Sequence, residues 1–66
     1  MSVRYPDIEV PMEGEDGNAF AIIGRVRKAL RKAKVSQEEI DLFSTEAMAG
    51  DYDNLLQTVM RWVEVV

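Results

Sequence analysis

The side chains that could do chemistry in this chain are carboxylates, because its 66 residues include no cysteine and no histidine. That absence removes thiol nucleophiles, imidazole bases and Cys/His zinc sites. Two carboxylates can act as general acid and base, but they need a pocket, and the spacing here instead suits solvated helix surfaces. We therefore predict a protein that is not an enzyme and uses no cofactor and no metal ion. The acidic candidates for binding a partner are Glu38, Glu39, Asp41, Glu46, Asp51 and Asp53.

Charge is strongly segregated along this small acidic chain. The net charge is −4, yet residues 25–34 carry six basic side chains and no acid. The segments before and after this block are both acidic. Segregated charge steers and orients one protein on another, and a dense basic surface is also what binding to nucleic acid requires. The charge pattern therefore favours a binding protein and leaves both kinds of partner open.

The widest apolar stripe belongs to residues 51–66, and the other elements must cover it. On a helical wheel the stripe is made by Tyr52, Leu55, Leu56, Val59, Met60, Trp62, Val63 and Val66. Asp51 is placed to cap this helix, and Asp53 complements its dipole. We expect the helix to run to about Val63, although residues 62–66 also alternate as a short strand would.

Two further helices are predicted before it. Residues 19–34 form an amphipathic pattern with basic side chains on the polar side, and Asp16 or Asn18 can cap its start. Ser36 and Glu39 form a capping box, which begins a helix that we expect to end at Gly50 in the C′ position. This second helix should bury a face made by Ile40, Phe43, Ala47 and Met48.

The N-terminal residues show the alternation of a half-buried strand, with Ile8 and Val10 among the apolar positions. Pro6 and Pro11 cannot donate to a ladder, which confines the segment to a sheet edge or an extended arm. Glycines and acids in residues 13–18 then predict a solvated turn.

Together these patterns predict a mainly α fold, a small three-helix unit with an N-terminal extended arm or edge strand. The alternative is an α+β fold in which the N-terminal strand pairs with the Val63–Val66 tail. The length suits a single domain over residues 1–66, with the arm and acidic turn at residues 1–17 and the helical unit at residues 18–66.

Phe20 and Gly24 break the amphipathic pattern, because they lie one turn apart on the polar side, in line with Lys28 and Arg31. A mid-helix glycine costs about 1 kcal/mol relative to alanine, so something should approach the backbone there. Either the N-terminal arm folds over this spot, or the four residues form a docking surface for another molecule.

Three stretches of sequence carry a resemblance. They are DGNAF at residues 16–20, IGRVRKALRKAKVSQEEID at residues 23–41 and AGDYDNLLQTVMRWVEV at residues 49–65. Over about residues 8–65 the chain resembles a group of short proteins that recur in bacterial and bacteriophage genomes. The resemblance implies no activity and no catalytic residue. It implies the setting of a mobile element or accessory protein rather than that of a metabolic enzyme.

Two functions agree with these observations. The first is binding to another protein or to a second copy as a homodimer, and the bacteriophage setting suggests an inhibitor whose acids imitate phosphates to block a host nucleic-acid-handling machine. The alternative is nucleic-acid binding by the basic helix at residues 25–34, through Arg27, Lys28 and Arg31. No apolar run reaches signal-peptide or membrane-spanning length, so we expect a cytoplasmic protein without membrane contacts.

Overall fold

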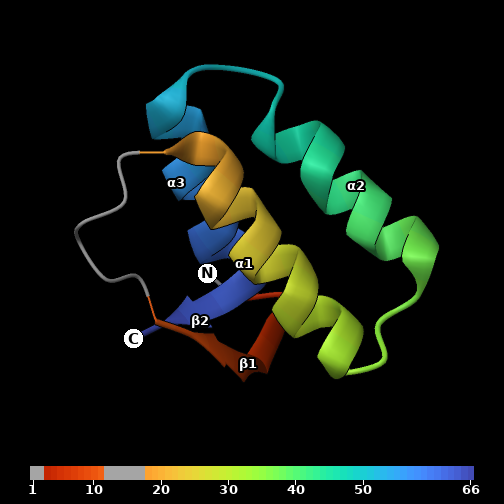
Figure 1. The fold of residues 1–66 in the computed structure, drawn as a ribbon. Helices are drawn as coiled ribbons and strands as arrows, with labels where there is room; N and C mark the ends of the chain where they lie inside the picture. The colour runs from red at the N-terminus through yellow and green to blue at the C-terminus, as the bar shows by residue number, and fades with distance from the viewer. Residues whose placement is uncertain (1–2, 12–17) are drawn as a thin grey trace.

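The computed structural model describes residues 3–11 and 18–66, which form a strand, three helices and a second strand in chain order. Residues 13–17 of the turn predicted at residues 13–18 lie outside the described residues. The elements are β1 (Tyr5–Val10), α1 (Ala19–Lys32), α2 (Gln37–Ala47), α3 (Tyr52–Trp62) and β2 (Val63–Val65). In Figure 1, α1 crosses in front of α3, α2 lies beside α1, and the two strands lie at the lower end of the helices.

β1 and β2 form a parallel pair, so the N-terminal segment is a strand and its partner is the C-terminal tail. The register joins Tyr5 to Val63 and Val10 to Val65, with an irregularity in the pairing after Tyr5. Pro6 lies within that irregularity and has no N–H to donate to a ladder. Because parallel strands need a long connection, the three helices together serve as the crossover. The mainly α fold is confirmed, in the form that pairs the N-terminal strand with the tail.

Every element contributes to one hydrophobic core. Trp62 is its largest side chain and is only 2% exposed. Ile8 from β1 and Val35 from the α1–α2 connection pack against the core from its edge. The buried apolar residues are Val10, Ile22, Ile23, Val26, Leu30, Ile40, Phe43, Ala47, Leu55, Val59, Trp62 and Val63.

Each helix begins at a capping side chain close in sequence to the N–H group that it binds. The side chains of Asn18, Ser36 and Asp51 accept backbone N–H groups at 2.9, 3.3 and 3.0 Å respectively. These bonds satisfy donors that have no partner within the helix. Ser36 and Asp51 act as predicted, and of the two candidates for α1 the cap is Asn18.

α1 ends two residues earlier than predicted, in a left-handed turn that contains no glycine. Lys34 has a φ of 66°, and its N–H donates to the carbonyl oxygen of Arg31 at 3.0 Å. The N–H of Val35 donates to Leu30 O at 3.0 Å. These two bonds are those of a Schellman motif, in which glycine is the preferred residue at the left-handed position.

The prediction that Gly50 forms the left-handed end of α2 is wrong. α2 is capped by Met48, and none of the described glycines has a positive φ. A methyl group on Gly50 would lie 2.9 Å from Cβ of Asn54. The Asn54 amide donates to the Glu46 carbonyl oxygen at 3.0 Å. Glycine is therefore needed here to let Asn54 reach the free carbonyls at the end of α2, and not to reverse the chain.

Two methionines predicted to be buried are exposed instead. Met48 is 54% exposed and Met60 is 55% exposed. Thr58, which lies outside the predicted apolar stripe, is fully buried. Its hydroxyl donates to the Asn54 carbonyl oxygen at 2.8 Å and accepts from Arg61 at 3.2 Å. The buried face of α3 is therefore rotated toward Thr58, since a hydroxyl satisfied within its own helix can enter the core at little cost.

Replacing Lys34 with glycine should stabilise the protein. Lys34→Gly relieves a left-handed backbone that costs a non-glycine residue about 1 kcal/mol, so we expect the free energy of unfolding to rise by about 0.5–1 kcal/mol. The control is Lys32→Gly in the last turn of α1, which should lower the free energy of unfolding by a similar amount. Urea unfolding of both variants tests this, and an equal loss in both would contradict the assigned end of α1.

Trp62 should dominate the stability of the fold. Trp62→Ala leaves a large cavity and should cost about 3–5 kcal/mol, which is comparable with the whole stability of so small a domain. Met60 lies two residues away and is exposed, so Met60→Ala should change the free energy of unfolding by less than about 0.5 kcal/mol. Circular dichroism melting of the two variants measures this difference. A folded Trp62→Ala protein with an unchanged melting temperature would refute the arrangement of the core.

Candidate interaction face

The carboxylate of Glu39 holds the N-terminal strand on α2. It accepts from Arg4 Nε at 3.1 Å and from the Tyr5 hydroxyl at 3.0 Å. The Ser36 side chain caps the backbone N–H of Glu39, as the capping box predicts. In a complete capping box the Glu39 carboxylate would accept the N–H of Ser36, but here it accepts from Tyr5 of β1 instead. This acid therefore serves the fold, and its charge is already neutralised by Arg4.

Arg4 and Tyr5 also cover Trp62, next to this ion pair. The Arg4 guanidinium lies 4.5 Å from the centre of the indole ring, within range of a cation–π interaction. The Tyr5 ring stacks on the same indole at a centroid distance of 6.0 Å. A hollow of about 380 Å³ opens beside these groups, lined by Val3, Arg4, Glu46, Arg61 and Trp62. The charged groups around Trp62 thus connect separate elements of the fold.

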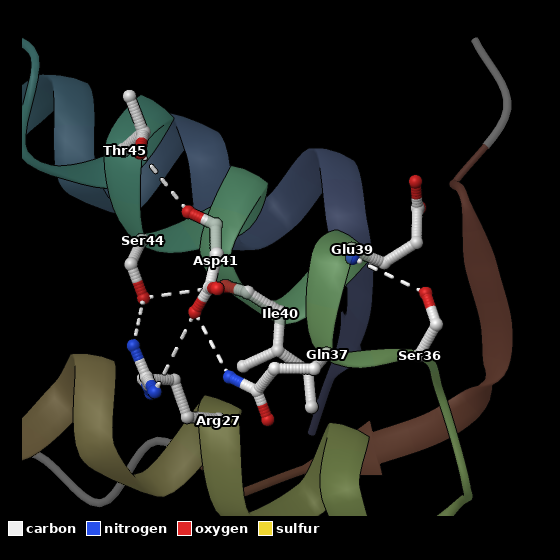
Figure 2. Close-up of polar contacts among 8 residues, drawn as sticks. All are labelled: Arg27, Ser36, Gln37, Glu39, Ile40, Asp41, Ser44 and Thr45. Carbon is white, nitrogen blue, oxygen red and sulfur yellow. Dashed lines mark hydrogen bonds and ion pairs between the residues drawn. The ribbon is translucent and has the colours of Figure 1, made fainter.

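Asp41 and Arg27 belong to a network that joins α1 to α2, which Figure 2 shows from the side. Arg27 donates to the Ser44 hydroxyl at 2.7 Å and lies 3.9 Å from a carboxylate oxygen of Asp41. The Gln37 amide donates to the same carboxylate oxygen at 2.9 Å. Arg27 therefore points toward α2 and away from the other basic residues of the predicted nucleic-acid surface.

The remaining acidic candidates divide into two kinds. Glu46 accepts the indole N–H of Trp62 at 2.8 Å, and Asp51 is the cap of α3. Glu38 and Asp53 are exposed and make no hydrogen bond or ion pair with the described part of the chain. Four of the six acidic candidates are thus used within the molecule.

The basic residues of the 25–34 block, apart from Arg27, are arranged differently. Arg25 donates to the carbonyl oxygen of Pro11 at 3.1 Å, which places the end of the N-terminal arm on that side of α1. The side chains of the others are exposed and form no hydrogen bond or ion pair with the described residues. They are Lys28, Arg31, Lys32 and Lys34.

Phe20 and Gly24 lie on an exposed side of α1. Phe20 is 74% exposed, the largest exposed fraction among the large apolar side chains of the described chain. A methyl group on Gly24 would meet no atom within 4 Å outside its own helix backbone. The predicted cover by the N-terminal arm is therefore not found in the described residues. Phe20, Gly24, Lys28 and Arg31 form a continuous exposed row, which we call the α1 stripe.

An apolar groove of about 350 Å³ adjoins the Phe20 end of this stripe, where the start of α1, the end of α2 and the start of α3 meet. Asp51 stands at its border, and buried Ile23 and Leu55 lie at its base. The more exposed parts of its wall are Phe20, Met48 and Tyr52. Helical periodicity does not reveal this groove, because it predicts that Met48 and Tyr52 are buried in the core, whereas both are exposed. The α1 stripe and the apolar groove together form what we call the contact face.

No protein-family model, no curated protein and no solved structure matches the chain. The resemblance to short bacterial and bacteriophage proteins therefore stays a prediction. Among residues 3–11 and 18–66, no three acidic side chains are gathered so that they could hold a metal ion. None of the described helices has the length and apolar composition needed to cross a membrane.

The contact between Tyr5 and Glu39 should appear in the pH dependence of stability. Burial of the Tyr5 ring raises its pKa above the ordinary value of 10.0, and the hydrogen bond and negative charge of Glu39 raise it further, against a smaller opposing effect of Arg4. The folded state therefore holds this proton more tightly than the unfolded state. The resulting stability is present below about pH 10 and is lost as the pH rises through the folded pKa.

Glu39→Gln should accordingly bring the pKa of Tyr5 closer to 10.0. Ultraviolet titration of tyrosinate in the wild type and in Glu39→Gln measures the change, and Tyr5→Phe identifies which part of the signal belongs to Tyr5. A titration curve that Glu39→Gln leaves unchanged would contradict the contact.

Proposed function

We propose that this chain is a non-enzymatic protein-interaction module that binds its partner through the contact face. The observation that carries the proposal is the 74% exposure of Phe20 beside a mid-helix glycine that nothing in the described chain covers. An exposed aromatic ring gives up the free energy of burial, and the glycine costs about 1 kcal/mol of helix stability. Neither cost is offset by a contact among the described residues, whereas a partner that covers Phe20 and Gly24 would account for both.

The composition of the contact face also suits a protein partner. Aromatic residues, methionine and arginine are enriched at protein interfaces, and the face combines Phe20 and Met48 with Arg31. The groove provides the concave apolar centre, and the charges of the stripe provide a polar border. A partner would bury the apolar groove and form ion pairs with the charged side chains of the α1 stripe.

Imitation of phosphates by the acidic residues receives less support. An inhibitor of that kind needs a row of free carboxylates, but Glu39, Asp41 and Glu46 are engaged by Arg4, Arg27 and Trp62. Glu38 and Asp53 alone would have to carry the interaction. We therefore assign partner binding to the contact face, and not to the acids of α2.

Nucleic-acid binding is the second candidate function, and one observation favours it. Lys28, Arg31, Lys32 and Lys34 are exposed and have no partner in the described chain. Against it, Arg27 is directed to α2, and the net charge of the chain is −4. The exposed phenylalanine in the same stripe has no evident role in contacts to phosphates. A protein partner accounts for more of the face.

Site-specific photo-crosslinking distinguishes these candidates. A photoreactive phenylalanine analogue is placed at Phe20, and at Leu42 as a matched control, since Leu42 is also apolar and exposed but lies on α2. The resemblance makes a bacterial lysate the first choice. We expect position 20, and not position 42, to form a protein adduct that survives nuclease treatment.

Other outcomes decide against the proposal. An adduct at position 20 that disappears with nuclease would favour nucleic-acid binding instead. Equal adducts at both positions, or no adduct at position 20, would refute the contact face as a binding surface.

A further inference from the structure

We infer that the partner of the contact face is a second copy of this chain, whose α1 packs antiparallel to the first and crosses it at Gly24. The inference rests on the proposed function, because it names the partner of the same face. It concerns two properties of that face, its shape along α1 and the distribution of charge between its ends.

The shape of the α1 stripe is self-complementary about Gly24. Phe20 lies four residues before Gly24 and Lys28 four residues after it, so both are one turn away on the same side of the helix. Ala21, which is also exposed, keeps the middle of the stripe small. In an antiparallel pair with a two-fold axis at Gly24, each Phe20 meets Lys28 of the other copy. The two glycines allow the helix backbones to approach closely.

The charges of the contact face also oppose each other end to end. At the groove end, the exposed α3 cap Asp51 lines the groove, and exposed Asp53 follows in the first turn of α3. At the other end, α1 carries Lys28 and Arg31, both exposed. An antiparallel arrangement brings the acidic end of each copy toward the basic end of the other, whereas a parallel arrangement would bring like charges together.

The same chemistry already holds this fold together. The Arg4 guanidinium stacks on Trp62 at 4.5 Å while it pairs with Glu39 at 3.1 Å. In the antiparallel pair, Lys28 of one copy would lie over Phe20 of the other, close to carboxylates at the start of α3. A cation between an aromatic face and a carboxylate is stabilised by both.

A second copy matches the face better than an unrelated helix does. An acidic amphipathic helix would satisfy Lys28 and Arg31, but it would be repelled by Asp51 and Asp53 at the groove end. The second copy satisfies both ends at once. A closed two-fold pair also suits a chain of only 66 residues, because small domains often gain stability by association.

The test uses a substitution that the isolated fold should accept. Gly24→Gln adds a side chain where the described chain leaves open space, and it improves helix propensity, so the variant should fold at least as stably as the wild type. Ala33→Gln is the control, because Ala33 is the exposed C-cap of α1, nine residues after Gly24 and outside the α1 stripe. Circular dichroism confirms that both variants are folded.

Sedimentation equilibrium from micromolar to millimolar concentration then measures the dimer. We expect the wild type and Ala33→Gln to dimerise alike, and Gly24→Gln to dimerise more weakly by about tenfold or more, which corresponds to about 1.4 kcal/mol. A wild type that is monomeric over the whole range, or a dimer that Gly24→Gln leaves unchanged, would overturn the inference.

Crosslinking of the purified chain tests the orientation. A photoreactive phenylalanine analogue at position 20 should form an adduct near Lys28 of the second copy, and an adduct near position 20 of that copy would overturn the antiparallel arrangement. The lysate experiment separates the two proposals. If the chain is monomeric but position 20 captures a different protein, the proposed function stands and the second copy is excluded. If position 20 captures nothing in either experiment, both proposals fail.

Discussion

The structure depends on the burial of Trp62, at the point where α3 passes into β2. The indole packs edge-on against Phe43 of α2 at a centroid distance of 5.6 Å and is stacked by Tyr5 of β1. Its N–H would be costly to bury without an acceptor, and Glu46 supplies one at 2.8 Å. One side chain thereby joins α2, α3 and β1. In a domain with no disulfide, such a residue holds together elements that a short chain could not otherwise keep in place.

The position of Trp62 explains why so many charged side chains serve the fold. Arg4 lies over the indole and pairs with Glu39, while Arg27 and Asp41 separately join α1 to α2. Both pairs are partly exposed to solvent, so they connect the elements while each contributes only modestly to stability. Once these pairs are assigned, the net charge of −4 includes several acidic and basic side chains that are already paired within the molecule. The charges that bear on function are those left without an internal role.

The residues that have no evident role in the fold and bear on function lie on the contact face. Phe20 and Gly24 contradict the local rules for a solvated helix face, and the described chain offers no compensation for either. Sites that break such rules without benefit to the fold are where function is expected. The contact face is proposed as a binding surface for this reason, and its opposed charges lead to the second copy as the partner.

The sequence by itself determined the local features of this protein. Asn18, Ser36 and Asp51 cap helices through bonds that span two or three residues, and the exposed positions of Phe20, Gly24, Lys28 and Arg31 follow from helical spacing. Interactions of that range depend on neighbours in the chain, so a pattern can reveal them.

Tertiary structure decided the features that join distant residues. The pairing of β1 with β2 brings the two ends of the chain together, and the ion pair of Arg4 with Glu39 spans 35 positions in sequence. The exposure of Met48 and the burial of Thr58 depend on how each helix is rotated against its neighbours, which one helical wheel cannot specify. The apolar groove exists only where three helix ends meet. No single stretch of sequence contains it, because its walls are packed together only in the folded chain.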